Sequence, residues 1–168
     1  MKVGFIGLGA MGKGMAHNLL LKGHELAVFD QSPAALSAFV QQHASSACTQ
    51  AASAAQAAHE AAVLICMLPT TAHTRAVLFG QDGAMSTLKP GSVVMDMGTG
   101  HPGEILALGK ELAAMGYHLV DAPVNRAPPE AESGTLLAMV GGDATQVEQV
   151  MPLLECMCDT IHRMGALG

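Results

Sequence analysis

The sequence predicts an α/β domain with a doubly wound, mostly parallel sheet. Three observations lead to this prediction. Short apolar runs alternate with amphipathic stretches along the whole chain, a glycine motif joins the first such pair, and residues 63–69 form an uninterrupted apolar run. Alternating strands and helices are typical of a sheet covered by helices on both faces, and a fully apolar strand is typical of its middle. At 168 residues, the chain is long enough for one domain with a substantial core.

The first thirty residues carry the most informative pattern. Residues 2–6 form an apolar run, residues 7–12 read Gly-x-Gly-x-x-Gly, residues 11–21 have helical spacing, and residues 25–29 form a second strand that ends at Asp30. In such a unit the glycines allow a tight turn, close approach of a pyrophosphate and close packing of helix on strand. The helix N-terminus offers free N–H groups to the phosphates. The pattern predicts a Rossmann-type dinucleotide site in which the acid accepts the adenosine ribose hydroxyls.

Asp30 also discriminates between the two dinucleotides. A 2′-phosphate would lie against its charge, and residues 31–33, Gln-Ser-Pro, offer no arginine to pair with that phosphate. The sequence therefore predicts NAD(H) as the cofactor in preference to NADP(H).

The remaining elements follow in order along the chain. Ser32 and Pro33 are typical of a helix start, Pro69 ends the central strand, and Asp143 caps a late helix. Residues 125–133 contain two prolines and two glutamates and are predicted to form a loop. We expect further helices over residues 33–43, 53–62, 71–79, 102–115 and 144–157, and further strands near residues 47–48 and over 63–69, 92–97, 117–124, 134–142 and 160–162.

Composition excludes several classes of protein. The net charge is −6 and the eight Lys and Arg are scattered, which argues against a nucleic-acid partner. No apolar run reaches the length of about 18 residues that a membrane span requires, and Met1 leads directly into a strand, so we expect a cytoplasmic protein. We expect free thiols, because the four cysteines do not form a disulfide framework, and no metal site, because the eight histidines form no ligand-spaced cluster.

Five stretches, in order, resemble the β-hydroxyacid dehydrogenase family, which contains 3-hydroxyisobutyrate dehydrogenase: residues 4–12, 67–69, 96–99, 121–124, and 134–136 with 139–142. The resemblance implies NAD(P)-dependent interconversion of a short hydroxyacid and its aldehyde, and a homodimer or homotetramer for the parent protein. It also implies cofactor contacts at Ala10, Met11, Asp30, Leu68 and Thr99. Together with the glycine motif and the strand ends, the predicted cofactor site comprises Gly7, Leu8, Gly9, Ala10, Met11, Gly12, Asp30, Leu68, Pro69 and Thr99.

The sequence departs from the family after Val124. The family usually has Ser-Gly-Gly there, whereas this chain has Asn125-Arg126-Ala127. A branch resembling sulfolactaldehyde reductase also carries arginine at this place. A guanidinium beside the nicotinamide would bind an anionic group through two parallel hydrogen bonds. Asn125 and Arg126 are therefore the predicted substrate-binding residues. The competing interpretation is a surface arginine paired with the glutamates of the same loop. Gly98 also stands at a position where the family commonly has serine.

The resemblance places the family's catalytic lysine beyond Gly168, since residues 163–168 match a glycine-rich segment that precedes it. We therefore expect residues 1–168 to be the NAD-binding domain of a longer enzyme, without the family's C-terminal helical domain. This chain alone should bind cofactor without turnover, and no catalytic residue is assigned within it. Two alternatives remain: an enzyme of the 3-hydroxyisobutyrate or the tartronate or succinic semialdehyde type, and a non-catalytic NAD-binding module.

Overall fold

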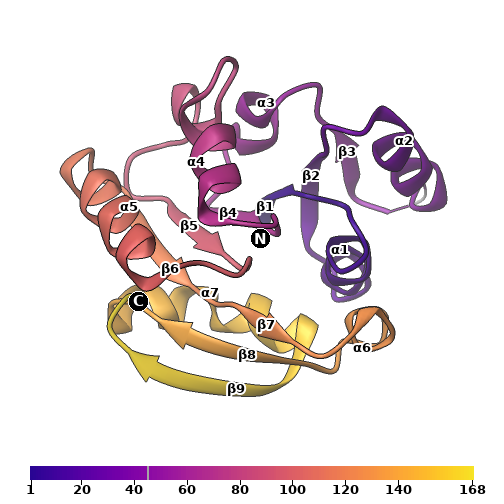
Figure 1. Ribbon diagram of the computed structural model, residues 1–168. Helices are drawn as coiled ribbons and strands as arrows, with labels where there is room; N and C mark the ends of the chain where they lie inside the picture. The colour runs from indigo at the N-terminus through magenta and orange to yellow at the C-terminus, as the bar shows by residue number, and fades with distance from the viewer. Residues whose placement is uncertain (45) are drawn as a thin grey trace.

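The computed structural model describes residues 1–44 and 46–168, and in this part of the chain nine strands form one sheet with helices on both faces (Figure 1). The strand order is β3-β2-β1-β4-β5-β6-β8-β7, and β9 pairs with β8. The first six strands in this order are parallel, whereas β8 is antiparallel to β6 and β7 and parallel to β9. The strands are β1 (Lys2–Ile6), β2 (Glu25–Phe29), β3 (Cys48–Gln50), β4 (Val63–Cys66), β5 (Val93–Asp96), β6 (His118–Asp121), β7 (Val124–Asn125), β8 (Leu136–Gly141) and β9 (Cys158–Gly165).

Helices cover the sheet in two layers, each with its own core. The helices α1, α2 and α7 pack on one face, and α3, α4 and α5 pack on the other. The prediction of a doubly wound, mostly parallel sheet is therefore confirmed. The helices are α1 (Gly12–Leu21), α2 (Pro33–Gln42), α3 (Ala54–Ala58), α4 (Thr71–Phe79), α5 (Pro102–Ala114), α6 (Pro128–Ser133) and α7 (Ala144–Met157), with a short 3₁₀ turn at Ala84–Ser86.

Local signals in the first half of the chain predicted its elements well. The strand β2 has the predicted bounds. Ser32 caps α2 by accepting the N–H of Ala35 at 3.3 Å, and Gly23, with φ +84°, follows the end of α1. The predicted helix at residues 53–62 is wrong in length, because α3 ends at Ala58 and Glu60 adopts φ +61°.

The second half of the chain departs more from the expectations. The predicted strand at residues 117–124 is two strands, because the chain leaves β6 after Asp121 and pairs Val124 with Ala138 of β8. The last strand, β9, has eight residues where three were expected. Its length comes from pairing with β8, a contact between segments that are far apart in sequence.

The loop predicted at residues 125–133 is wrong, since Pro128–Ser133 form α6. Two prolines begin this helix, where no intrahelical N–H is needed and their fixed φ suits the first turn. Glu130 accepts the N–H of Ala127 at 3.1 Å, and Gly134, with φ +70°, ends the helix. Proline here starts a helix instead of preventing one.

Helix α6 packs against α1, and the two helices lie side by side in Figure 1. The buried Asn18 amide donates to the carbonyls of Ala131 and Glu132 at 2.9 and 3.1 Å. A Cβ at Gly14 would lie 2.7 Å from the α6 backbone. The contact therefore requires a glycine on α1 and holds the segment after β7 against the helix that follows the glycine turn. No helix in the described part of the chain is long and apolar enough to cross a bilayer.

Candidate functional site

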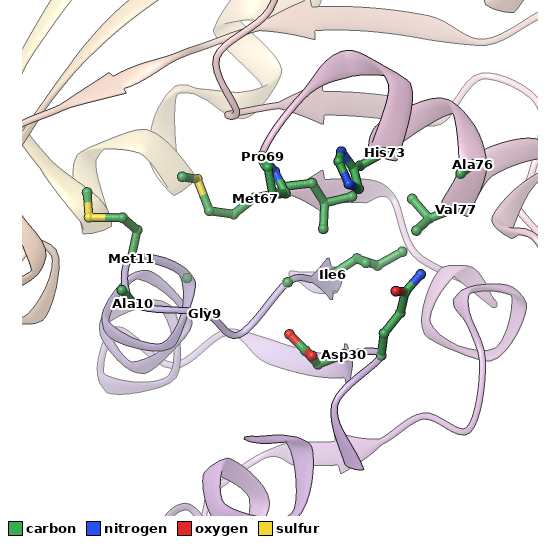
Figure 2. A pocket seen from close by; sticks show the side chains of 14 residues that line it. Ile6, Gly9, Ala10, Met11, Asp30, Met67, Pro69, His73, Ala76 and Val77 are labelled. Carbon is green, nitrogen blue, oxygen red and sulfur yellow. The ribbon is translucent and has the colours of Figure 1, made fainter. Parts of the chain in front are cut away.

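A pocket of about 480 Å³ opens where β1, β2 and β4 end. Figure 2 shows it between the glycine turn and Asp30 on one side and the start of α4 on the other. The lining residues are Ile6, Gly7, Gly9, Ala10, Met11, Gly12, Asp30, Gln31, Met67, Leu68, Pro69, His73, Ala76 and Val77. The structure thus brings together eight of the ten residues predicted to bind the cofactor: Gly7, Gly9, Ala10, Met11, Gly12, Asp30, Leu68 and Pro69.

The three glycines of the motif have three different environments. A Cβ at Gly12 would lie 1.8 Å from the Gly7 carbonyl oxygen, and a Cβ at Gly7 would lie 2.2 Å from the Met67 carbonyl oxygen. Gly7 also has φ +102°, which side chains disfavour. Gly9, in contrast, has open space around it and faces the pocket. Gly7 and Gly12 are needed for the packing, and Gly9 keeps the pocket open.

Main-chain hydrogen bonds orient the Asp30 carboxylate at the end of β2. The N–H of Leu8 donates to Oδ2 at 2.7 Å, and the N–H of Ser32 donates to Oδ1 at 2.7 Å. Because a carboxylate oxygen can accept more than one hydrogen bond, both oxygens keep acceptor capacity for hydroxyl groups in the pocket. The Leu8 side chain is buried in the core and does not line the pocket, and its N–H orients Asp30.

The opposite wall is built by the segment after β4. Met67, Leu68 and Pro69 lead into α4, which adds His73, Ala76 and Val77. Sequence reasoning missed these three residues of α4. Their spacing by three and four positions, on a helix that begins just after a strand end, is the signal that could have found them.

Thr99 lies outside this pocket and is exposed, whereas Met97 and Gly98, which precede it after β5, are buried. The same segment approaches the pocket wall at Gly98, where a Cβ would lie 2.2 Å from the Leu68 carbonyl oxygen. Nearby, the buried Asp96 accepts hydrogen bonds from Thr74 Oγ1 and from the N–H of Gly98, both at 3.2 Å. These contacts join the end of β5 to α4. Burial, which disfavours the ionised carboxylate, raises the pKa of Asp96.

A second pocket, of about 340 Å³, lies at the ends of β5, β6 and β8. Asp121 lines it beside Pro123 and Gly98. Among the described residues, the buried Asp121 Oδ1 makes no hydrogen bond, and burial raises the pKa of this carboxyl against the opposing effect of the Gly168 main-chain N–H. The pocket continues the row of strand ends beyond Leu68 and Gly98.

Arg126 does not line either of these two pockets. Its φ is +86°, and its guanidinium contacts the Thr135 carbonyl oxygen, Asp159 Oδ1 at 2.8 Å and Thr160 Oγ1 at 3.2 Å. The role of Arg126 in binding substrate stays a prediction. The expected alternative, pairing with the glutamates of the same segment, is not found, since the recorded ion pair is with Asp159 on β9. Asn125 Oδ1 accepts the N–H of Arg126 at 2.6 Å, so this side chain supports the turn.

A parallel sheet with this glycine turn and an oriented acid at the end of β2 defines a dinucleotide-binding domain. The family model described as the NAD binding domain of 6-phosphogluconate dehydrogenase matches residues 2–165. The chain belongs to this family, whose cofactor is NAD(H), and the prediction of that cofactor is confirmed at this level.

The relatives are β-hydroxyacid dehydrogenases of the 3-hydroxyisobutyrate dehydrogenase type. The 3-sulfolactaldehyde reductase of Escherichia coli (strain K12) is 42% identical over 99% of this chain and 54% of that protein. The Mycobacterium tuberculosis 3-hydroxyisobutyrate dehydrogenase, solved with L-serine, superposes with a TM-score of 0.90 at 31% identity, over 99% of this chain and 55% of the other. Psf3, solved with NADP⁺ and 2-OPP, has a TM-score of 0.86 at 27% identity, over 95% and 55%. The chain thus spans about half the length of the curated relatives it matches.

Proposed function

We propose that the protein is an NAD(H)-dependent oxidoreductase that interconverts a short anionic hydroxyacid and its aldehyde. Residues 1–168 form its NAD-binding domain, and sulfolactaldehyde is the first substrate to test. The observation that carries the proposal is the Asp30 carboxylate, which two main-chain N–H groups orient at a pocket of about 480 Å³. When the cofactor is bound, its nicotinamide supplies hydride transfer. The chain's own residues bind the dinucleotide and orient it.

Different residues of the site bind different parts of the dinucleotide. Asp30 accepts the ribose hydroxyls of the adenosine half, and its charge disfavours a 2′-phosphate. Gly9 and the N-terminal turn of α1 receive the pyrophosphate, with Ala10 and Met11 beside it. Leu68 and Pro69 form the opposite wall and lead toward Thr99, which we assign to the nicotinamide half. In this assignment Leu8 binds no ligand directly, because its N–H serves Asp30.

The nature of the substrate is inferred from Arg126 and from the relatives. The 42% identical relative is a sulfolactaldehyde reductase, and the anionic group of such a substrate requires a cationic partner. The ion pair of Arg126 with Asp159 is partly exposed, at 35% and 47% of the two side chains, so solvent screens it and it is weak. An incoming sulfonate or carboxylate can therefore compete with Asp159 for the guanidinium. Asn125 orients the main chain at this place.

The test of this function is steady-state kinetics of the full-length protein with a panel of anionic aldehydes. The panel includes sulfolactaldehyde and the semialdehydes of methylmalonate, tartronate and succinate. We expect NADH-dependent reduction of at least one. In Arg126→Ala, kcat/KM for that aldehyde should fall by an amount equivalent to about 2–5 kcal/mol of transition-state stabilisation, because a desolvated anion loses its partner. Arg126→Lys keeps the charge but cannot make two parallel hydrogen bonds, so its kcat/KM should lie between those of wild type and Arg126→Ala.

Two results would contradict the proposal in different ways. An Arg126→Ala enzyme with unchanged kcat/KM would make Arg126 a surface residue and remove the reason for preferring a sulfonate. Tight NADH binding by the full-length protein without turnover of any aldehyde in the panel would instead favour a non-catalytic NAD-binding module.

A further inference from the structure

Two histidines from different helices face each other where α1, α2 and α6 meet. His17 lies on α1, and His43 is the residue that ends α2. His17 Nδ1 lies 2.8 Å from His43 Nε2, and the ring centroids are 5.1 Å apart. Both rings line a pocket of about 250 Å³, together with Glu132 of α6. The pair therefore joins the helix of the glycine turn to the helix that follows Asp30.

The ring of His43 is fixed by its own helix as well. His43 is buried, and its ring packs on the Phe39 ring at a centroid distance of 4.3 Å. Its Nδ1 lies 2.8 Å from the Phe39 carbonyl oxygen. Because a carbonyl oxygen can only accept, Nδ1 of His43 carries a proton. The neutral His43 ring therefore presents an unprotonated Nε2 to His17, and His17 Nδ1–H donates to it.

These contacts limit the charge that the pair can carry. When one ring gains a proton, the hydrogen bond survives, because one of the two facing nitrogens still has a lone pair. When both rings are charged, both facing nitrogens carry hydrogen, so no acceptor remains and two like charges adjoin. Histidine is the side chain that ordinarily changes charge between about pH 5 and 8, so acidification through this range can break the contact.

The charged groups around the pair come from α1 and α6. Lys13 and Glu132 line the same pocket, and α2 itself carries no charged side chain. Lys13 repels a charged ring and Glu132 attracts one. A metal ion does not fit between the rings, since two Zn–N bonds of about 2.0–2.1 Å at a tetrahedral angle need the nitrogens further apart. Within the described residues, no group of three or more His, Cys, Asp or Glu side chains could hold a metal ion.

We propose that His17 and His43 form a pH-sensitive latch, which holds α2 on α1 while at most one of the two rings is charged and releases it when both are. In the open form each ring can take a proton, whereas the closed pair takes only one, so acidification favours the open form. The competing role is structural: His43 ends α2 through the Phe39 carbonyl, and His17 only fills space beside it. The latch does not depend on the proposed function.

The experiment measures hydrogen exchange of the α2 amides in the full-length protein at about pH 7.5 and about pH 5.5. Three proteins are compared: wild type, His17→Gln and His118→Gln. Glutamine has both a donor and an acceptor, so it can bond Nε2 of His43 in either charge state of that ring. His118 is exposed on β6, and its ring makes no hydrogen bond within the described residues, so its replacement is the matched control. The thermal midpoint of each variant shows whether it is folded.

On acidification, we expect the protection of these amides, corrected for intrinsic exchange, to fall about 3- to 10-fold in wild type, the value of one hydrogen bond. The same fall should occur in His118→Gln, whereas His17→Gln should lose less than about twofold. Nitrogen NMR of the histidines in wild type should show coupling between the two facing nitrogens at the higher pH and its loss at the lower. A His17→Gln protein that loses protection as wild type does, or wild-type spectra without this coupling, would overturn the latch. Neither result would bear on the proposed function.

Discussion

The two ends of the sheet hold their side chains in different ways. At the β1–β2 end, Asp30 is oriented by main-chain N–H groups, and Gly7 and Gly12 sit where any Cβ would collide with a carbonyl oxygen. At the β7–β9 end, Arg126 is held mainly by side chains and one carbonyl, through a partly exposed ion pair. Main-chain contacts cannot be exchanged without disturbing the fold, whereas an exposed ion pair can exchange partners.

This difference matches the division of labour in the proposed function. The cofactor is common to the family, so a site built from main chain and glycine packing can be shared by all its members. The relatives' names differ in the substrate they give, a sulfolactaldehyde in one and a hydroxyisobutyrate in another. We infer that the β1–β2 end is the fixed part of the site and that the β7–β9 end is the part that selects the substrate.

The largest expected effect separates packing from binding within the glycine motif. Gly12→Ala places a methyl group 1.8 Å from the Gly7 carbonyl oxygen, so it should lower the free energy of unfolding by more than about 3 kcal/mol. Gly9→Ala is the matched control, since nothing lies within 4 Å of the added methyl group. It should leave the unfolding midpoint near wild type and weaken NADH binding, because Gly9 lines the pocket. Denaturant titration together with NADH titration checks both, and equal unfolding midpoints for the two variants would contradict the packing argument.

A second prediction uses the buried carboxyl that joins β5 to α4. Burial raises the pKa of Asp96 above its ordinary value, so folding favours the protonated form. The stability that this group contributes is present at low pH and is lost as pH rises through the folded-state pKa, with a slope of at most about 1.4 kcal/mol per pH unit. Asp96→Asn should flatten the pH dependence of the unfolding free energy above pH 4. The exposed Asp82, changed to Asn, is the control and should leave the slope as it is. A steeper pH dependence of the unfolding free energy in Asp96→Asn than in wild type would contradict the sign that we assign to the Asp96 contribution.

The smallest expected effect tests whether the Arg126 contact is as exchangeable as we infer. Asp159→Asn should leave the free energy of unfolding close to that of wild type, because both side chains of the pair are partly exposed and solvent screens them. Glu148→Gln, which removes the similar exposed pair with Arg163, provides the comparison. Urea denaturation measures both. A clear loss of stability in Asp159→Asn, with none in Glu148→Gln, would mean that Arg126 is a structural residue of the β7–β9 end.

The same division explains what the sequence could predict. The first strand–turn–helix–strand unit was predictable because its signals are local: glycines at fixed spacing, the caps and the acid lie within about thirty residues. The short helix α6 was missed because its two prolines were interpreted as a break, although proline suits the first turn of a helix. Its docking on Asn18 depends on residues more than a hundred positions apart.

The same contrast between local and long-range contacts applies to the candidate site. The cofactor positions in the glycine turn and at Asp30 follow from local pattern, and the structure brings them together. His73 was missed because its place in the pocket depends on how α4 folds back over the strand ends. The partner of Arg126 was missed because Asp159 lies 33 residues away and reaches it only through the pairing of β8 with β9. Sequence pattern predicts contacts within a unit better than contacts between units.

The most direct test of the central claim is a calorimetric comparison of NADH and NADPH binding to the wild-type protein and to a protein carrying Asp30→Ser with Gln31→Arg. The claim is that Asp30, oriented by the main chain, makes the β1–β2 end an NAD(H) site. It predicts that wild type binds NADH at least about tenfold more tightly than NADPH, since a 2′-phosphate would face an unpaired carboxylate. The double variant should narrow or reverse that order. A wild-type protein that binds NADPH as tightly as NADH, or more tightly, would contradict the claim.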